Sequence, residues 1–392
     1  MMFRSFVCVM LFVVSAASKS ADIELWHAHQ AQDFVVHLAK QFEAETGQRI
    51  RISAYKTSRV KAELLLGAKN NVLPDMIFVP SDFLGLYHEL KLNRLNDSWL
   101  DPAISANAKD TAVIDGNLYG VPVIQGNHLM LYYNKSLVAK PATSWHQLLK
   151  QQDALAAKGV RTIGWNYNEM FWFVPFLGAY GSTPITDGKV TLNTPQMVSA
   201  LRFYQSLSNR GLIDPGCDYN CAQKDFVDGA TAYAINGDWA YADLKAELGD
   251  DLGLAVLPAI DDKPLRPFSS TFTLAFPRVM GDSKRQETLR LFARFVQSEL
   301  IQRQTYQSYQ LLPTNSAVFA ALRDSVSGQQ RVLFQQLATT NPMPSEASMA
   351  IVWQAMAVAY QRFINKGYTP EQTAQYMQQV ADRELARFMA GR

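Results

Sequence analysis

Between residues 23 and 79 the chain alternates short apolar runs with amphipathic segments, and this alternation constrains its fold more than any other feature. Three runs have the pattern of strands, the last of them apolar throughout like a strand buried on both faces: 23–26, 49–54 and 75–79. One helix is expected from a capping Asp33 to a stop at Gly47, and a second over 60–68. The order predicts the α/β class: an open, mostly parallel sheet with helices on both faces.

A second set of strands and helices follows a change of pattern near residue 125. We expect the chain to cross between the two sets in extended segments, including 118–123 and 268–276. Beyond the first crossing we expect helices over 144–158 and 195–209, strands over 230–235 and 252–257, and mostly helix from 282 onward. No linker rich in Gly, Ser or Pro separates the halves. The sequence therefore favours two lobes joined by several crossings over two independent domains.

The first residues have the order of a secretory signal peptide. Arg4 precedes an apolar run over 6–14, and small residues follow over 15–18. That run is too short to span a bilayer, no second run of spanning length follows, and Cys8 lacks a clear lipid-attachment motif before it. We expect residues 1–20 to be removed, with cleavage between 16 and 21, and the mature protein to reside in the periplasm.

Cys217 and Cys221 are the two cysteines that remain after such a cleavage. They share one short loop of an exported chain, so we expect a disulfide between them that staples a local turn. A zinc site normally needs four ligands, and no second Cys or His pair lies nearby, so we expect no metal here. We also expect this loop to lie away from the functional site.

Charge and composition narrow the possible partners. The chain has 37 basic and 35 acidic residues, and no basic stripe interleaved with aromatic residues. Proteins that bind nucleic acid normally present such a stripe, so we expect no nucleic-acid partner. A hydrophobic content of 48% with long periodic segments indicates a globular protein of roughly two domains.

Residues 232–241 place two aromatic side chains just beyond a strand. A short apolar strand enters Asn236-Gly237-Asp238, and Trp239 and Tyr241 follow at the start of a helix. Open α/β sheets bind ligands at the carboxyl ends of their strands, where flat rings can line a site. The same rings could equally be packing residues, since most aromatic side chains lie in the core.

Six residue strings in order give the chain a resemblance to the maltose-binding protein and its relatives, the family 1 extracellular solute-binding proteins of ABC importers. The strings are 41–47, 73–78, 119–122, 132–135, 166–175 and 234–240, and together they extend over nearly the whole mature chain. The resemblance implies two α/β lobes joined by hinge crossings, a sugar held between them, a membrane ABC permease as partner, a monomer and no cofactor. We expect the N-terminal lobe to comprise 21–125 plus 273–317, and the C-terminal lobe 126–272 plus 318–392.

The resemblance also implies which aromatic residues stack on the sugar. Trp239 is similar to the family's stacking tryptophan, and Phe171 and Trp172 to the aromatic residues that follow its carboxylate. Trp353 is similar to the family's last stacking tryptophan. Tyr241 is a further ring that could cover a sugar face, because the carbon-bound hydrogens of a sugar give it apolar faces.

The polar contacts implied by the resemblance are carboxylates and amides. Glu169 precedes the aromatic pair, and Asp82, after the 75–79 strand, is similar to the family's hydroxyl-binding aspartate. Gln30 and Asn127 are amides where the family has acidic sugar contacts. Carboxylates accept hydrogen bonds from hydroxyl groups strongly because the acceptor is charged.

Several of these and neighbouring residues have structural interpretations. Asp82 could instead cap the helix that follows it. Trp26 and Trp145 are assigned to the core. His27 and His29 lie at the end of one strand and could bind a metal ion, but two histidines without a third ligand are more often ordinary polar residues at a strand end.

The sequence is also compatible with three other functions. Asp82 and Glu169 could be the carboxylate pair of a secreted glycosidase, although no nucleophile motif is present. The ligand could be a phosphorylated polyol, but Phe83 stands where the family has an arginine, and Val79 and Ala31 also differ from familiar maltose contacts. The ligand-bound lobes could also dock on a sensor receptor. We expect a binding protein without catalytic residues that captures an oligosaccharide, such as a maltodextrin-like glycan, and delivers it to an ABC permease. The ligand need not be maltose itself.

Overall fold

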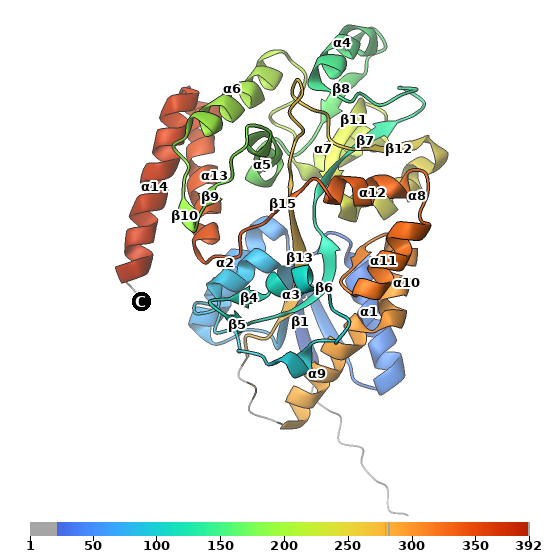
Figure 1. Ribbon diagram of the computed structural model, residues 1–392, viewed down its shortest axis with the longest axis vertical. Helices are drawn as coiled ribbons and strands as arrows, with labels where there is room; N and C mark the ends of the chain where they lie inside the picture. The colour runs from blue at the N-terminus through green and yellow to red at the C-terminus, as the bar shows by residue number, and fades with distance from the viewer. Residues whose placement is uncertain (1–21, 279, 281–282, 391–392) are drawn as a thin grey trace, which may run out of the picture.

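The structure is a computed structural model that describes residues 22–278, 280 and 283–390. Two β-sheets follow one another along its long axis, each covered by helices (Figure 1). The expected signal peptide lies outside the described residues. Among the helices that the structure describes, none combines the length and the apolar composition that a membrane crossing requires.

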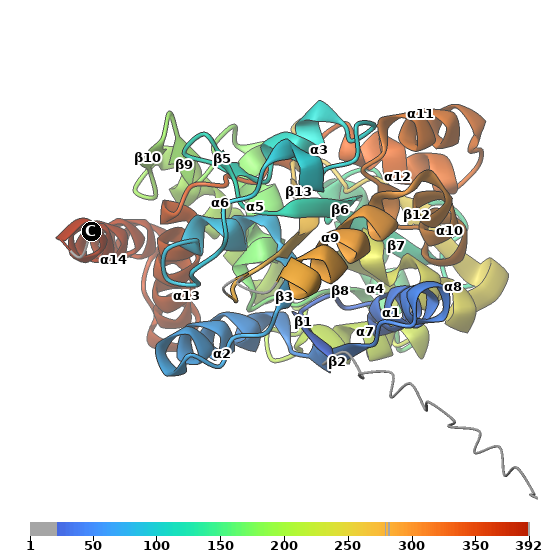
Figure 2. The ribbon, with the colours of Figure 1, turned by 90° about the horizontal axis from the view of Figure 1, so that it is seen from below.

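The first sheet has the strand order β14-β6-β13-β3-β1-β2, with β15 paired to β13. Its strands are β1 (Ile23–His27), β2 (Ile50–Ala54), β3 (Met76–Pro80), β6 (Val121–Gly126), β13 (Phe268–Ala275), β14 (Leu312–Pro313) and β15 (Asn341–Pro342). β1 pairs in parallel with β2 and β3, as the alternation predicts. The connecting helices α1 (Gln32–Thr46) and α2 (Thr57–Asn70) lie on opposite faces of this sheet (Figure 2).

The start of α1 differs from the sequence prediction. Ala31 occupies the N-cap position without a side-chain capping bond, and Asp33 lies inside the first turn. The predicted cap at Asp33 is therefore wrong, although an acidic residue in the first turn still interacts favourably with the helix dipole. Gly47 ends the helix in a left-handed conformation, as predicted.

The second sheet has the order β12-β7-β11-β8. Its strands are β7 (Leu129–Asn134), β8 (Arg161–Gly164), β11 (Thr231–Gly237) and β12 (Leu252–Ala255). Two small antiparallel pairs complete the described strands: β4 (Val113–Ile114) with β5 (Asn117–Leu118), and β9 (Ile185–Thr186) with β10 (Lys189–Val190).

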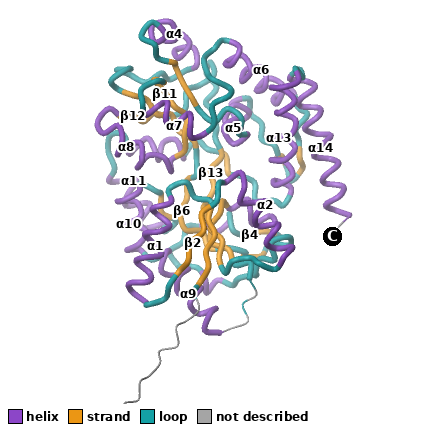
Figure 3. The backbone as a smooth tube through the Cα atoms, turned by 180° about the vertical axis from the view of Figure 1, so that it is seen from behind, coloured by secondary structure: helices purple, strands orange, loops and turns teal. Residues whose placement is uncertain are grey.

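Helices surround both sheets. The remaining α-helices are α3 (Ala106–Asp110), α4 (Trp145–Ala156), α5 (Met170–Ala179), α6 (Pro195–Asn209), α7 (Tyr219–Val227), α8 (Tyr241–Leu248), α9 (Ser283–Gln297), α10 (Glu299–Tyr309), α11 (Ser316–Ser325), α12 (Gln330–Leu337), α13 (Ser348–Lys366) and α14 (Pro370–Ala390). Short 3-10 helices are η1 (Ser81–Leu86), η2 (Asp97–Trp99), η3 (Asp238–Ala240) and η4 (Gly249–Asp251). α13 and α14 pack side by side along one flank of the molecule (Figure 3). The long helical region predicted after residue 282 is confirmed.

The prediction that the sheets are mostly parallel is wrong, because both sheets are mixed. β13 runs antiparallel to β3 and β6, and β7 runs antiparallel to β11 and β12. The physical reason lies in the crossings: β6 leaves the first sheet toward the second, whereas β13 returns from the second to the first (Figure 1). Strands that travel in opposite directions and lie side by side pair antiparallel. The α/β class itself is confirmed.

The outward crossing between β6 and β7 has a left-handed backbone. Gly126 has a φ of 111° and Asn127 a φ of 45°. A Cβ atom on Gly126 would lie 2.2 Å from Oδ2 of Asp238, so the space and the backbone both require glycine here. Asn127 Nδ2 donates a hydrogen bond of 2.7 Å to Oγ of Ser270 on β13, which ties the outward crossing to the returning one.

Replacing Gly126 by alanine is therefore expected to lower the free energy of unfolding by more than about 1 kcal/mol, since Ala is strained at positive φ and must displace Asp238. Thermal and urea unfolding would measure this loss. Gly164→Ala in β8 is the matched control, because its Cβ would meet its nearest neighbour, Thr231 Cγ2, at an ordinary 3.5 Å. Equal stability of the two variants would contradict the strain at the crossing.

Candidate functional site

Four of the predicted aromatic residues gather in one cluster near the crossings. The ring centroids of Phe171 and Trp239 lie 6.1 Å apart, those of Trp172 and Trp239 6.2 Å, and those of Phe171 and Trp353 6.4 Å. These residues come from α5, η3 and α13, which lie far apart in the sequence. We call Phe171, Trp172, Trp239 and Trp353 the aromatic cluster.

Trp239 owes its place to the turn after β11. Gly237 ends the strand, and a Cβ atom there would lie only 2.2 Å from the Trp239 ring, so the indole folds back closely over the glycine. Tyr132 OH donates a hydrogen bond of 2.8 Å to the Gly237 carbonyl oxygen and fixes the strand end. Only 7% of Trp239 remains exposed, so its ring is largely packed.

The two aromatic residues of α5 differ in exposure. Trp172 is 6% exposed, and its Nε1 donates a hydrogen bond of 2.9 Å to the Ile235 carbonyl oxygen of β11. Phe171 is only partly buried and contacts the other three members of the cluster. Trp172 therefore anchors the cluster to the second sheet, whereas Phe171 keeps part of its ring available to a ligand.

Asp82 lies at the point where α13 meets the first sheet. Its Oδ2 accepts a hydrogen bond of 3.0 Å from Nε1 of Trp353. η1 and the start of α13 approach closely because Gly85 of η1 has no side chain. A Cβ atom at Gly85 would lie 2.8 Å from Cα of Ala347, the N-cap residue of α13. Pro80 occupies the N-cap of η1, so the alternative capping role of Asp82 is not seen.

Burial raises the pKa of Asp82 to about 6, against the opposing hydrogen bond from Trp353 and the nearby charge of Lys61. The Lys61 ammonium donates a hydrogen bond of 3.2 Å to the Ala350 carbonyl oxygen, and burial lowers the pKa of this lysine. A carboxyl group with this pKa changes charge close to neutral pH, which is typical of functional sites.

Glu169 occupies the N-cap position of α5 without a side-chain capping bond. Its side chain is exposed to solvent, yet the surrounding protein raises its pKa by desolvation. The carboxylate is thus reached by water while protein atoms around it remove part of its hydration. Such a position suits a group that accepts hydrogen bonds from a ligand.

The two predicted amides make local contacts. Gln30 lies in the loop after β1 and is exposed, and its Nε2 donates a hydrogen bond of 3.2 Å to Oγ1 of Thr57. Asn127 lies in the crossing, where it bonds to Ser270 as described above. Their hydrogen bonds therefore run to the start of α2 and to β13, and not to the aromatic cluster.

Tyr241, the first residue of α8, is 7% exposed. Its electrostatic neighbours include Tyr132 and Tyr306, and burial raises its pKa. Trp239 is equally buried but contacts Phe171 and Trp172, whereas these neighbours of Tyr241 lie outside the aromatic cluster, which favours the packing interpretation for the Tyr241 ring.

Known proteins with a similar sequence or structure identify the family. A model of the bacterial extracellular solute-binding protein family matches residues 37–334, which is most of the chain. The chain belongs to this family. The resemblance found in the sequence is thereby confirmed.

The relatives of this solute-binding protein include a maltooligosaccharide ABC transporter solute-binding lipoprotein of Streptococcus pneumoniae (strain ATCC BAA-255 / R6). It is 22% identical over 365 residues, which cover 86% of this chain and 83% of the relative. The maltodextrin-binding protein MdxE of Bacillus subtilis (strain 168) is 21% identical over 342 residues, which cover 82% and 80%. The maltose/maltodextrin-binding domain MalE from Bdellovibrio bacteriovorus, solved bound to maltotriose, has a TM-score of 0.85 at 22% identity, covering 93% of this chain and 100% of that one. This likeness confirms the two-lobe fold.

The structure also adds residues that sequence reasoning missed. Tyr219 OH accepts a hydrogen bond of 3.1 Å from Nε1 of Trp239, and its ring lies 6.0 Å from that of Trp172. Phe268 of β13 lies 6.2 Å from Trp353. Tyr219 belongs to the loop closed by the disulfide between Cys217 and Cys221. The expectation that this loop lies away from the candidate site is therefore wrong, because Tyr219 contacts both Trp239 and Trp172.

The two strand-end histidines are buried. Burial lowers the pKa of His27 to about 4 and that of His29 to about 3, so both are neutral at neutral pH. His29 packs among aromatic rings, with Phe272 at 4.5 Å, which favours a packing role. Within the described residues, the one group of three potential metal ligands is Cys217, Cys221 and Asp225, and both of its cysteines are in the disulfide.

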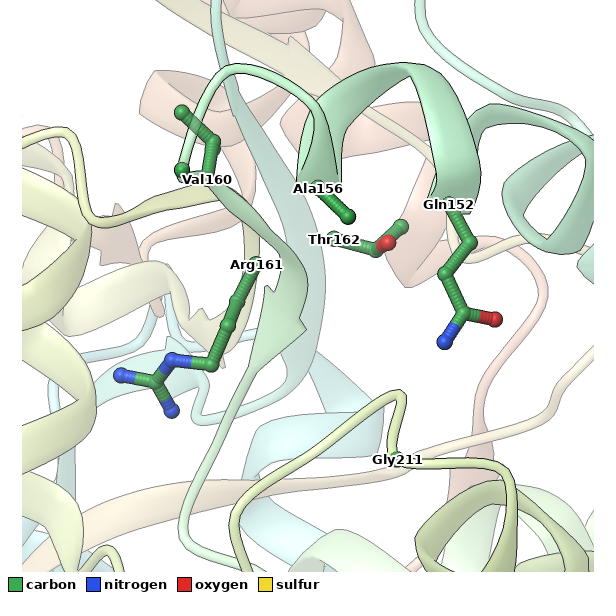
Figure 4. A pocket seen from close by; sticks show the side chains of 7 residues that line it. Gln152, Ala156, Val160, Arg161, Thr162 and Gly211 are labelled. Atoms are coloured by element: carbon green, nitrogen blue, oxygen red, sulfur yellow. The ribbon is translucent and has the colours of Figure 1, made fainter.

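Two shallow depressions elsewhere are poorer candidates for the site. One of about 250 Å³ lies between α4 and β8 and is lined by Gln152, Ala156, Gly159, Val160, Arg161, Thr162 and Gly211 (Figure 4). The other, of about 410 Å³, is lined by Ser98, Glu287, Arg290, Leu291 and Arg294. Neither lining contains an aromatic ring, so neither offers the flat apolar wall that a sugar face needs.

Proposed function

We propose that this solute-binding protein captures a maltodextrin-like oligosaccharide between its two lobes and delivers it to an ABC permease. The observation that carries the proposal is the aromatic cluster next to the buried carboxyl group of Asp82. Phe171, Trp239 and Trp353 would stack on the sugar faces, while Asp82 and Glu169 would accept hydrogen bonds from hydroxyl groups.

The relatives support this choice of ligand. The Streptococcus protein is a maltooligosaccharide carrier by name, and the Bdellovibrio domain is bound to maltotriose. A receptor of Streptomyces glaucescens, GacH, was solved with acarbose and has a TM-score of 0.82 at 20% identity, covering 93% of this chain and 97% of that one. The first two ligands are maltooligosaccharides, whose apolar faces the rings of the aromatic cluster would cover.

The proposal includes the location and organisation of the protein. We place the mature chain in the periplasm as a monomer that performs no covalent chemistry and has neither cofactor nor nucleic-acid partner. The N-terminal lobe would comprise 21–125 plus 273–317 and the C-terminal lobe 126–272 plus 318–392. The lobes would close on the ligand about the crossings that Asn127 and Ser270 tie together.

The competing functions receive less support. The glycosidase alternative gains no support from the relatives, which are named as solute-binding or maltodextrin-binding proteins. A phosphorylated ligand needs a cation such as arginine, but Phe83 is apolar and 9% exposed. A role with a sensor receptor would use the same ligand site and changes only the partner.

Thermal unfolding with a panel of ligands tests the proposal. Maltotriose at one hundred times its dissociation constant is expected to stabilise the mature protein by about 2.7 kcal/mol. Cellotriose, whose β-linkages give a straighter chain, is the matched control and should stabilise it far less. Stabilisation by a phosphorylated polyol alone, or release of new reducing ends from maltotriose, would contradict the proposed function.

A further inference from the structure

The disulfide ring encloses a residue that contacts the proposed ligand site. Cys217 and Cys221 are bridged, and Tyr219 lies between them as the first residue of α7. Asp218 caps this helix, since its Oδ1 accepts a hydrogen bond of 3.0 Å from the Cys221 backbone N–H. The ring and the cap together limit the positions open to the Tyr219 side chain.

The hydroxyl group of Tyr219 meets two groups from the end of β11. It accepts the hydrogen bond from Nε1 of Trp239, and the Asn236 side chain also bonds to it. Trp239 is largely buried, so its N–H would lose its partner if Tyr219 moved away, and an unpaired buried donor is costly. The edge-to-face contact of Tyr219 with Trp172 adds a second restraint on the cluster.

The segment around the disulfide ring, residues 215–225, is fixed at two further points. Nδ2 of Asn168, the neighbour of Glu169, donates a hydrogen bond of 2.7 Å to the Pro215 carbonyl oxygen. Oδ2 of Asp225 lies 3.7 Å from both sulfur atoms of the disulfide and forms an ion pair with Arg161 of β8. The loop therefore connects the carboxylate side of the site, through Asn168, with its stacking side, through Tyr219.

We propose that Tyr219 is a positioning residue for the stacking ring of Trp239, and that the disulfide between Cys217 and Cys221 holds Tyr219 in place. This inference rests on the proposed function, because it concerns the orientation of a ring in the same site. Tyr219 acts through Trp239 by fixing the plane of the indole. The disulfide then affects ligand affinity by the same route, in addition to stapling a local turn.

Tyr219→Phe tests the first step, because it keeps the ring and removes only the acceptor. Titration calorimetry with maltotriose is expected to show affinity weaker by about tenfold, the change that one such hydrogen bond produces. Tyr204→Phe is the matched control: Tyr204 OH also accepts a hydrogen bond from a tryptophan, Trp165 Nε1 at 2.7 Å, but in the core. That variant should melt earlier and bind as wild type does. Unchanged affinity in Tyr219→Phe would overturn the proposal.

The double variant Cys217→Ser, Cys221→Ser tests the second step. It is expected to weaken maltotriose binding several-fold in the wild-type background, and to cause no further loss when combined with Tyr219→Phe, because coupled residues do not add. If the affinity losses of Tyr219→Phe and of the double cysteine variant add fully, the disulfide acts by another route, and its proposed role in holding Tyr219 is overturned.

A ligand-free measurement separates this inference from the proposed function. The emission of Trp239, taken as the difference between each protein and its Trp239→Phe counterpart, should shift in Tyr219→Phe and in the double cysteine variant but not in Tyr204→Phe. If the wild type binds no oligosaccharide, the proposed function fails, and the emission still decides whether Tyr219 positions Trp239. An unshifted emission in Tyr219→Phe would refute the positioning role.

Discussion

Replacing Trp239 by alanine is expected to weaken oligosaccharide binding by about 2–4 kcal/mol, as loss of a central aromatic anchor does. The structure adds a second expected effect. Because Trp239 is 7% exposed and packs over Gly237, the variant should also lose about 3 kcal/mol of its free energy of unfolding, as truncation of a large core ring does. Paired calorimetric titration and thermal unfolding would measure both losses.

Trp353→Ala is the control that separates stacking from packing. Trp353 is only partly buried, so this variant should lose binding by a similar amount while its free energy of unfolding falls much less. If Trp239→Ala melts early but binds maltotriose normally once folded, Trp239 is a packing residue and the stacking surface consists of Phe171 and Trp353. If neither variant loses affinity, the aromatic cluster is not the ligand site.

The part of the fold that local patterns determine could be predicted from the sequence. β1, β2 and β3 and the helices between them follow from periodicity, and parallel pairing follows from the connecting helices. The antiparallel pairing of β13 could not be predicted in this way. It depends on the direction in which the chain returns from the other lobe, and no pattern within Phe268–Ala275 records that direction.

In the candidate site, too, some features could be predicted from local sequence patterns and others could not. The sequence singles out Trp239, because an apolar strand runs into Asn236-Gly237-Asp238 and the aromatic residue follows at once. The bond between Asp82 and Trp353 joins residues that are 271 positions apart, so the sequence alone could name both residues by resemblance but could not pair them. Tyr219 carries no local signal of its role, since only the packing of α7 against β11 brings it to Trp239.

Replacing Asp82 by asparagine is expected to increase stability at pH 7.5 and to weaken ligand binding. Burial holds the pKa of Asp82 at about 6, above its ordinary value of 3.8, so the folded state binds the proton more tightly than the unfolded state. Wild-type stability should therefore fall as the pH rises from about 4 to about 6, and the full loss persists above that range. Asparagine carries no charge and can still accept the Trp353 hydrogen bond. The stability of the variant should therefore not fall over this pH range.

The gain in the free energy of unfolding should be about 1–3 kcal/mol at pH 7.5 and should shrink to less than about 1 kcal/mol at pH 4, where wild-type Asp82 is protonated in the folded state and about half protonated in the unfolded state. Binding should weaken by about 1–2 kcal/mol, because a neutral acceptor replaces a charged one, and wild-type affinity should itself fall below pH 6. Urea unfolding and calorimetry across pH 4–8 would measure both, with Asp153→Asn on the exposed face of α4 as control.

A stability difference that is the same at every pH would show that Asp82 keeps its charge, and would remove the electrostatic reason for assigning it to the ligand. If the difference instead follows pH while binding is unchanged, Asp82 is a buried partner of Trp353 alone, and Glu169 must supply the charged contact.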